Sequence, residues 1–277
     1  MLLIADSGST KTDWKLIGAN TDVYFQASGI NPFYMSNEQV LSELKMNVVP
    51  HINQQPEQLY FYGAGITGNQ KERMEQILSE LFSGSKIYAE SDLLGAARAL
   101  CGNEEGIACI MGTGANSCLY NGEKIIDNIP PLGFIQGDEG SGAVLGKKLI
   151  TMYLKRELSE ELSDKFKKQY GLDTSKILRK VYQEAFPNRF LAEFAKFIYQ
   201  NIEHEQMYQL VYESFIEFLE RNVFKYAKYK KLKIHFVGSI AFYFRDIIEK
   251  IFSEKKLKLG KIIKSPLDEL GKYHLNI

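Results

Sequence analysis

A chain of 277 residues with 45% apolar and 25% charged side chains has a globular composition and room for two domains. Its 34 acidic and 34 basic side chains cancel, which excludes global charge as the attraction for nucleic acid or an anionic membrane. The three cysteines form no Cys-x-x-Cys pair, which excludes a disulfide scaffold and a four-cysteine zinc site. The sequence shows no signal peptide and no long apolar run, so we expect a cytoplasmic protein that contacts neither nucleic acid nor a membrane.

The first hundred residues alternate between short apolar runs, small polar turns and helical periodicity. In chain order they predict strands over 2–5, 14–17 and 23–27, a helix over 38–47, a strand over 59–62, a helix over 70–82, a strand over 87–89 and a helix over 92–100. Turns over 6–10 and 18–21 join the first three strands as hairpins. A meander of this kind followed by alternating helices and strands predicts a mixed α/β sheet.

A similar order of elements begins again after residue 106. Strands are predicted over 107–111, 117–120 and 124–126, and a further strand over 234–237 ends in Gly238, much as 59–62 ends in Gly63. Aligning Gly8 with Gly114 places the two strand–turn–strand units in register. The sequence therefore predicts a weak internal repeat, with a mostly helical insertion over 140–230 and a boundary and hinge near 102–106.

Two of the turns have the residue types of a phosphate hairpin. In Asp6–Thr12 and in Gly112–Ser117, small residues let the backbone approach an anion, and N–H and hydroxyl groups can donate to it. An acid beside such a turn can hold Mg²⁺ through water. The first turn is no Walker A loop, because Gly-x₄-Gly-Lys-Ser/Thr is absent. Each turn alone could be an ordinary β-turn, but two in repeated positions favour binding of a polyphosphate.

Three further segments could contribute to a site. Gly133–Gly142 has four glycines around two acids, which suits close approach of a ligand or a turn with a capping acid. Gly238 and Ser239 follow a strand and can admit an adenine ring or simply end the strand. Asp92 follows the strand over 87–89 at the start of a helix, and its position alone favours a helix cap.

In combination and in this order, the segments resemble the sugar-kinase, heat-shock-chaperone and actin superfamily, and within it the BadF/BadG-type ATPases with their N-acetylglucosamine kinases. The resemblance covers nearly the whole chain. The turns at 6–12 and 112–117 resemble the two phosphate motifs, 238–241 the adenosine motif, and 137–142 is the most distinctive match. The resemblance implies an α/β fold of two ribonuclease-H-like (actin-like ATPase) lobes with ATP in the cleft between them.

In that fold the first lobe comprises residues 1–105 with a returning C-terminal segment, 265–277. The second lobe comprises residues 106–264 and contains the helical insertion.

The resemblance also implies a function. It predicts an ATP- and Mg²⁺-dependent kinase of an amino sugar, most directly N-acetylglucosamine, that phosphorylates the 6-hydroxyl group and forms a homodimer. Asp92 becomes the general base instead of a cap, and Asp6 holds Mg²⁺ through water. The implied ATP-binding residues are Ser7, Gly8, Ser9, Thr10, Lys11, Gly112, Thr113, Gly114, Asn116, Gly238 and Ser239. The implied sugar-binding residues are Asn31, Asp92, Thr113, Gly133, Phe134 and Asp138.

The chain departs from the family pattern in two respects. Ser7 and Ser9 stand where the first phosphate motif usually has glycine, so each brings a side chain to the predicted phosphate site. Cys101, Cys109 and Cys118 lack the pairing of the branch that activates acyl-CoA dehydratases through an iron–sulfur cluster, and the zinc-binding cysteines of other bacterial sugar kinases are missing. The alternatives are an ATPase that activates a partner protein and a non-catalytic sensor of a sugar or nucleotide.

Overall fold

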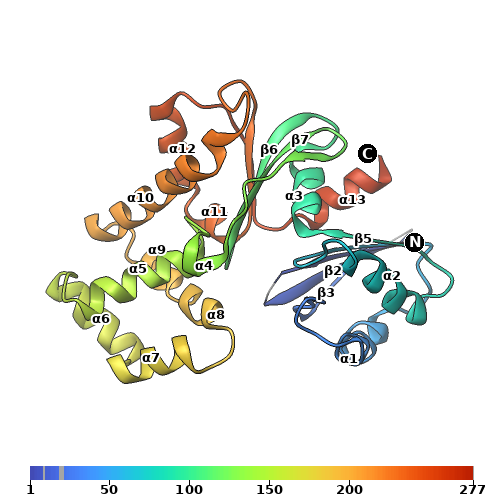
Figure 1. The fold of residues 1–277 in the computed structure, drawn as a ribbon, viewed down its shortest axis with the longest axis horizontal. Coiled ribbons are helices and arrows are strands. Elements are labelled where there is room, and N and C mark those ends of the chain that lie inside the picture. Colours follow the sequence, from blue (N-terminus) through green and yellow to red (C-terminus); the bar gives the residue numbers. More distant parts are fainter. Residues whose placement is uncertain (9, 19–21, 277) are drawn as a thin grey trace. The chain divides into compact units, whose positions relative to one another are not determined.

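The computed structural model describes residues 1–8, 10–18 and 22–276, so Ser9 and most of the predicted turn over 18–21 lie outside the described residues. The chain divides into two compact units (Figure 1). Unit 1 consists of Met1–Glu104, Tyr120–Ile125 and Ser265–Ile277, and unit 2 of Glu105–Leu119 and Ile126–Lys264. No helix in the described ranges is both long enough and apolar enough to cross a membrane.

The sheet of unit 1 confirms the predicted meander. Its strands lie in the order β3-β2-β1-β4-β5, with β1 antiparallel to β2 and parallel to β4. Strand β3 is antiparallel to β2, and β5 is parallel to β4. The elements of the unit are β1 Leu2–Ser7, β2 Lys11–Ile17, β3 Asp22–Ser28, α1 Asn37–Asn47, a 3₁₀ turn Val49–His51, β4 Gln58–Gly63, α2 Gln70–Leu81, β5 Lys86–Ser91, α3 Asp92–Cys101 and α13 Leu267–Leu275.

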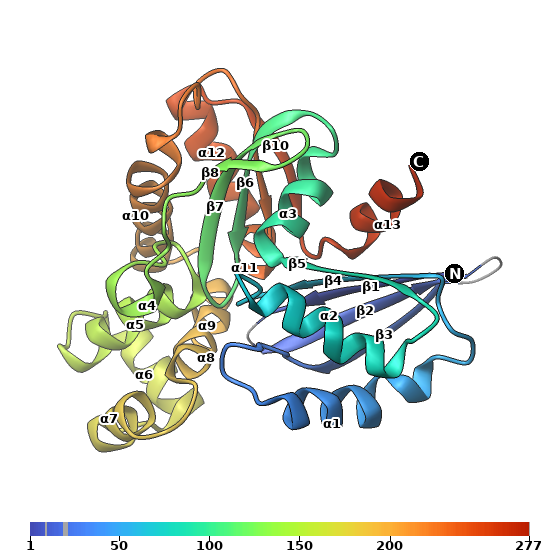
Figure 2. The same cartoon turned by 45° about the vertical axis from the view of Figure 1, so that its right-hand side comes forward.

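Helices cover both faces of this sheet (Figure 2). Side chains alternate between the two faces of a strand, and Leu3 and Ala5 of β1 belong to the core that packs under α1 and α2. Helices α3 and α13 lie on the opposite face. The buried Lys15 of β2 binds Asp268 of α13 at 2.8 Å and so ties the C-terminal helix to this sheet.

The sheet of unit 2 repeats the first. Its order is β10-β9-β6-β7-β8, so β6, β7, β8, β9 and β10 take the places of β1, β2, β3, β4 and β5. The strands are β6 Glu105–Met111, β7 Ala115–Asn121, β8 Ile125–Asp127, β9 Ile234–Val237 and β10 Leu259–Ile263. The α/β class and the two-lobed repeat predicted from the sequence are confirmed.

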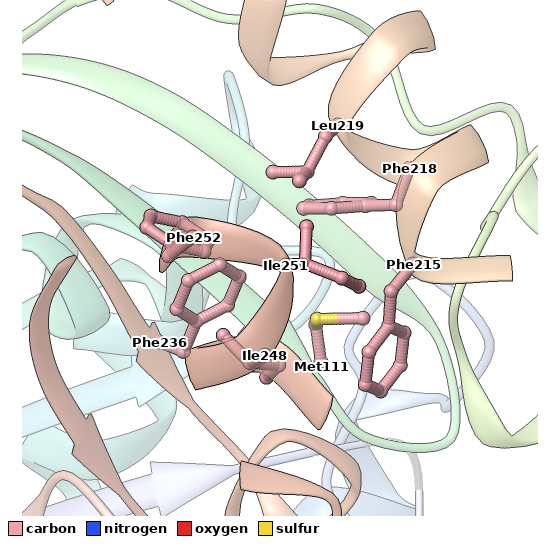
Figure 3. A pocket seen from close by; sticks show the side chains of 8 residues that line it. All are labelled: Met111, Phe215, Phe218, Leu219, Phe236, Ile248, Ile251 and Phe252. Atoms are coloured by element: carbon pink, nitrogen blue, oxygen red, sulfur yellow. The ribbon is translucent and has the colours of Figure 1, made fainter. Parts of the chain in front are cut away.

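The helices of unit 2 cover its sheet, and α5 to α10 lie in the predicted insertion over 140–230. They are α4 Gly133–Gln136, α5 Gly142–Leu154, α6 Glu160–Tyr170, α7 Thr174–Tyr182, α8 Pro187–Ala192, α9 Ala195–Gln200, α10 Glu205–Arg221, a 3₁₀ turn Val223–Lys225, α11 Ser239–Tyr243 and α12 Arg245–Lys255. Long helices α10 and α12 pack against β6 and β9 around a small cavity of about 10 Å³ (Figure 3). Only apolar side chains line this cavity, so it cannot hold a water molecule favourably.

Candidate active site

The first predicted phosphate turn connects β1 to β2 in unit 1. Gly8 donates its N–H to the carbonyl of Lys11 at 3.0 Å and closes the turn. The Ser7 hydroxyl is buried, lies 2.7 Å from the Thr12 hydroxyl and donates to the carbonyl of Ile30 at 2.9 Å. The Ser7 side chain therefore binds the chain after β3 and does not fill the surface of the turn, contrary to what its replacement of a glycine suggested.

The exposed part of the same turn carries a hydroxyl and a cation. Thr10 and Lys11 are exposed, and the Lys11 ammonium group pairs with Asp13 at 2.7 Å. Asp13 is also the register partner of Asp6 on the neighbouring strand. The turn thus offers donors to an anion, with two carboxylates directly behind them.

Asp92 is placed by the strand that precedes it. Ser91 ends β5, and its hydroxyl accepts the N–H of Leu94 at 3.2 Å, so Ser91 is the N-cap of α3. Asp92 is the first residue of the helix, and one of its carboxylate oxygens accepts the N–H of Leu93 at 2.9 Å. The position-based interpretation of Asp92 as the cap is wrong by one residue, because capping requires a non-helical backbone, which Ser91 has.

Asp6 and Asp92 form a pair of carboxylates at the same edge of the sheet. Strands β1, β4 and β5 are parallel, and Ser7, Gly63 and Ser91 are register partners across them. Asp6 comes one residue before this row and Asp92 one residue after it, so both lie at the carboxyl edge of the sheet. Burial raises the pKa of Asp92 to about 6. Burial and then the nearby charge of Asp92 raise the pKa of Asp6 to about 7. This edge of unit 1 therefore resists the accumulation of negative charge and would favour a bound cation.

Replacing Asp6 by Asn should stabilise the ligand-free protein at pH 8 by on the order of 2 kcal/mol. The pKa of Asp6 is raised by folding, so its contribution to stability is full below the ordinary value of 3.8 and is lost as the pH rises through about 7. Urea unfolding at pH 4 and at pH 8 measures the difference. The gain should disappear at pH 4, and Asp127→Asn, at an exposed site, should show neither effect.

Asn31 is held beside these carboxylates by the chain that follows β3. Ile30 donates its N–H to the Ser7 hydroxyl at 3.0 Å, which fixes the neighbouring Asn31 at the end of β1. The Asn31 side-chain oxygen accepts the N–H of Phe33 at 2.9 Å. Gly65 lies against the Asn31 amide with φ +82°, so any side chain there would collide with it. The Asn31 amide nitrogen remains as a donor for a ligand.

The second predicted phosphate turn packs against the glycine-rich loop in unit 2. Gly112 donates to the carbonyl of Gly114 at 2.9 Å and accepts from Gly142 at 2.8 Å. Ala143 donates to the carbonyl of Thr113 at 3.1 Å. The side-chain oxygen of Asn116 is shared by the N–H of Ser117, at 2.9 Å, and by Asn128, at 3.0 Å. Two motifs whose contacting residues lie 30 positions apart in the sequence thus form one surface.

Asp138 occupies the junction between this loop and this turn. It has the left-handed backbone conformation, φ +54°, which is uncommon for a residue other than glycine. Its carboxylate lies so close to Gly114 that a methyl group there would be 3.1 Å from Oδ2. Burial raises the pKa of Asp138 to about 6, against the hydrogen bond that it accepts from the N–H of Ala115.

Gly238 lies directly behind the second turn. It has φ +123° and would bring a side chain into the carbonyl group of Met111, the last residue of β6. Its N–H donates to the carbonyl of Ile263 at 3.0 Å, and Ser239 then begins α11. On its other side the Met111 side chain points into the apolar cavity between α10 and α12 (Figure 3). The end of β6 thus has room only for a glycine at position 238.

Gly133 and Phe134 form the start of the short helix α4. Gly133 has φ +70° with open space around it, whereas the ring of Phe134 packs partly against the core of unit 2. The carbonyl of Phe134 accepts a hydrogen bond from the ammonium group of Lys147 at 2.7 Å, and this bond fixes α4 to α5. Within each unit, therefore, the predicted residues that the structure describes come together: 6–8, 10–11, 31 and 92 in unit 1, and 112–116, 133–138 and 238–239 in unit 2.

Over its whole length the chain is similar in sequence and structure to a solved protein. A candidate N-acetylglucosamine kinase from Porphyromonas gingivalis shares 44% identity and a TM-score of 0.96, over 100% of this chain and 99% of that one. The chain belongs to the N-acetylglucosamine kinase-like branch of the BadF/BadG-type ATPase family. No protein-family model matches the chain, and no curated protein does.

Solved structures with much lower sequence identity share the fold. A candidate N-acetylglucosamine kinase from Chromobacterium violaceum has 17% identity and a TM-score of 0.73 over 98% of each chain. MreB 5 of Spiroplasma citri, solved with AMPPNP, has 10% identity and a TM-score of 0.57 over 99% of this chain and 95% of that one. The two-lobed architecture of this BadF/BadG-type protein is thus that of the actin-like ATPases.

Two features of this family member escaped the sequence analysis. Asp13 was not singled out, although its alternation with Lys11 along one strand places both on the face of Asp6. Gly65 lies against the side chain of Asn31, and the two glycines of Gly63-Ala64-Gly65 could have indicated that another segment approaches this backbone closely. In the parts of the chain that the structure describes, no group of three or more His, Cys, Asp or Glu side chains could enclose a metal ion.

Proposed function

We propose that the protein is an ATP-dependent sugar kinase, and specifically an N-acetylglucosamine kinase that transfers the γ-phosphoryl group of ATP to the sugar 6-hydroxyl. The observation that carries this proposal is the Asp92 carboxylate. Ser91, not Asp92, is the N-cap of α3. Asp92 lies at the carboxyl edge of β1, β4 and β5, and burial raises its pKa to about 6. A carboxylate poised near neutral pH suits a general base.

In the proposed reaction, Asp92 accepts the proton of the sugar hydroxyl as the hydroxyl oxygen attacks the γ-phosphorus. The bond from that phosphorus to the bridging oxygen breaks, and ADP leaves. The Leu93 N–H on one carboxylate oxygen orients the group and leaves the other oxygen for the proton. Asn31 donates its amide N–H to a sugar hydroxyl, and Asp138, with Thr113, Gly133 and Phe134, contributes the remaining sugar contacts. Binding and orientation by these groups would select the acceptor before phosphoryl transfer.

The residues of unit 1 fit the Mg²⁺ that such kinases require. Asp6 is a hard oxygen donor, and the charge of Asp92 raises its pKa, so a divalent cation would relieve the repulsion between them. Asp6 would hold the ion through water, and the bound ion would neutralise charge on the transferring phosphate. The phosphates would lie against the small turns, Ser7 to Lys11, with Ser9 outside the described residues, and Gly112 to Asn116. They would accept hydrogen bonds from N–H and hydroxyl groups other than the N–H groups of Gly8 and Gly112, which close the turns. Gly238 and Ser239 would border the adenine.

The decisive experiment is a screen of ATP consumption against glucose, glucosamine, mannose, N-acetylmannosamine and N-acetylglucosamine. We expect N-acetylglucosamine to give the highest kcat/KM and phosphorus NMR to locate the product phosphate on the 6-hydroxyl. ATP hydrolysis that no sugar accelerates would favour the partner-activating ATPase, and nucleotide binding without turnover would favour the sensor. The lobes at 1–105 with 265–277 and at 106–264, and the homodimer, remain predictions, and analytical ultracentrifugation tests the dimer.

Gly114→Val should weaken ATP binding at least about tenfold, because the new side chain displaces the Asp138 carboxylate and blocks the approach of phosphate to the turn. Isothermal titration with AMPPNP and Mg²⁺ measures the affinity. Gly84→Val is the matched control, since the space around Gly84 is open. Equal affinities of the Gly114 variant and the wild type would count against this turn as a phosphate site.

A further inference from the structure

Glu139 is a buried carboxylate that has no part in the function proposed above. Only 5% of its surface is exposed, and it lies in the loop between the proposed sugar ligand Asp138 and Gly140. One of its oxygens is 2.9 Å from the guanidinium of Arg221, and the other accepts a hydrogen bond from the Asn222 amide at 3.1 Å. These partners are the last residue of α10 and the residue after it.

A buried carboxylate is costly unless both oxygens are bonded, and here they are. Arg221 keeps about half of its own side chain exposed and also contacts Glu217 at 3.3 Å. Asn222 is buried, and its amide also donates to the carbonyl of Phe218 at 3.2 Å. The anchor of Glu139 is therefore the rigid C-terminal end of a 17-residue helix rather than a mobile surface group.

The backbone on both sides of Glu139 has the left-handed conformation, which glycine adopts freely and aspartate does not. Asp138 has φ +54° and Gly140 has φ +73°, and a side chain at Gly140 would come within 2.6 Å of the Met111 methyl group. Such conformations persist only where the surroundings hold them in place. The Glu139 bonds supply that restraint from one side of the loop.

On the other side the loop meets the second phosphate turn. The Asp138 carboxylate lies against Gly114 and accepts the N–H of Ala115. Gly142 donates to the carbonyl of Gly112 at 2.8 Å. A displacement of the loop would therefore move a proposed sugar ligand and a proposed phosphate turn together.

We propose that Glu139 is a positioning residue which, through Arg221 and Asn222, holds Asp138 against the turn at 112–116 in the geometry that binds the sugar. The role in sugar binding rests on the proposed function, whereas the anchoring of the loop does not. Glu139 also acts on Asp138 through its charge: the negative charge of Glu139 raises the pKa of Asp138, and the positive charge of Lys147 lowers it.

The test compares Glu139→Gln with Arg221→Met and with the control Glu217→Gln, which removes the other carboxylate beside Arg221. Loss of a charge-assisted bond should raise the KM for N-acetylglucosamine about 10- to 100-fold in Glu139→Gln, with a smaller change in kcat. Arg221→Met, which keeps the Asn222 bond, should change the KM in the same direction by less. The control should keep the wild-type KM.

Two readouts need no turnover. Hydrogen exchange of the Asp138, Ser141 and Gly142 amides, which are bonded to Pro131, Asp138 and Gly112, should accelerate in Glu139→Gln while unit 1 stays protected. Carbon NMR of the Asp138 carboxyl should show its titration at lower pH in Glu139→Gln, because that variant lacks the Glu139 charge; a shift in Arg221→Met, which keeps this charge on Glu139, would instead report displacement of the loop. Melting temperatures show whether the variants remain folded.

The outcomes separate the two proposals. If the wild type phosphorylates no sugar, the proposed function fails, and the exchange and NMR results still decide the anchoring role. Unchanged loop protection and an unchanged Asp138 titration in Glu139→Gln would overturn the inference. If that variant does not fold, Arg221→Met decides by the same exchange measurement, and wild-type protection of the loop in it would overturn the inference as well.

Discussion

Asp92→Asn is expected to lower kcat by about 10²- to 10⁴-fold, which corresponds to roughly 3–5 kcal/mol of activation free energy. Asparagine has nearly the same shape and can still accept the Leu93 N–H, but it cannot take the proton of the sugar hydroxyl. The helix cap is unaffected, because Ser91 provides it. Steady-state kinetics with N-acetylglucosamine and ATP, beside the melting temperature, measure the effect.

The matched control is Ser91→Ala, which removes the cap and leaves the carboxylate. It should cost about 1 kcal/mol of stability and change kcat far less than Asp92→Asn does. Folding raises the pKa of Asp92 to about 6, so its stabilising contribution is full below 3.8 and is lost as the pH rises through about 6. Asp92→Asn should therefore be at least as stable as the wild type at pH 8. A variant with near-normal kcat would remove Asp92 from the mechanism.

Gly238→Ala is expected to be the most damaging single methyl addition in the predicted site. The backbone at Gly238 has φ +123° and ψ 161°, a region open essentially to glycine alone, and the added methyl group would overlap the carbonyl of Met111. The overlap can be removed only if the end of β6 moves. The second phosphate turn begins at Gly112, directly after Met111, so it would move as well. We expect a loss of about 3 kcal/mol or more in the free energy of unfolding and weakened binding of AMPPNP.

The control for Gly238→Ala is Gly171→Ala, at the C-terminal cap of α6 in the same unit. Gly171 has φ +57° and open space around it, so an alanine there meets backbone strain without a collision. It should cost only about 1 kcal/mol and leave nucleotide binding intact. Chemical unfolding and titration calorimetry compare the two variants. Similar losses in both would mean that the contact with Met111 is unimportant.

The sequence by itself determined the local elements and their repetition. The apolar runs that form β1, β2 and β3 are bounded by small polar turns, and those that form β6 and β7 repeat the pattern. Apolar residues that recur every 2 or every 3.6 positions show which face of a strand or helix is buried. Such elements can therefore be predicted without knowing which element they pack against. Strand β10 is half-exposed and has lysines near it, so its sequence shows no clear difference between a buried and an exposed face, and it was not predicted. The family followed from the order of the motifs, and Asp92 as base from the resemblance alone.

Only the tertiary structure decided which side chains lie at the surface of the predicted site and which pack behind it. Ser7 was expected at the phosphate surface, but its hydroxyl bonds to Thr12 and Ile30. Asp138 and Gly114 are far apart in the sequence and in contact in the fold, and Glu139 meets its partners 82 and 83 residues later. A sequence pattern records the burial of each residue, whereas a hydrogen bond or ion pair depends on where two distant segments meet. That meeting is set by the packing of whole sheets and helices, which no local pattern contains.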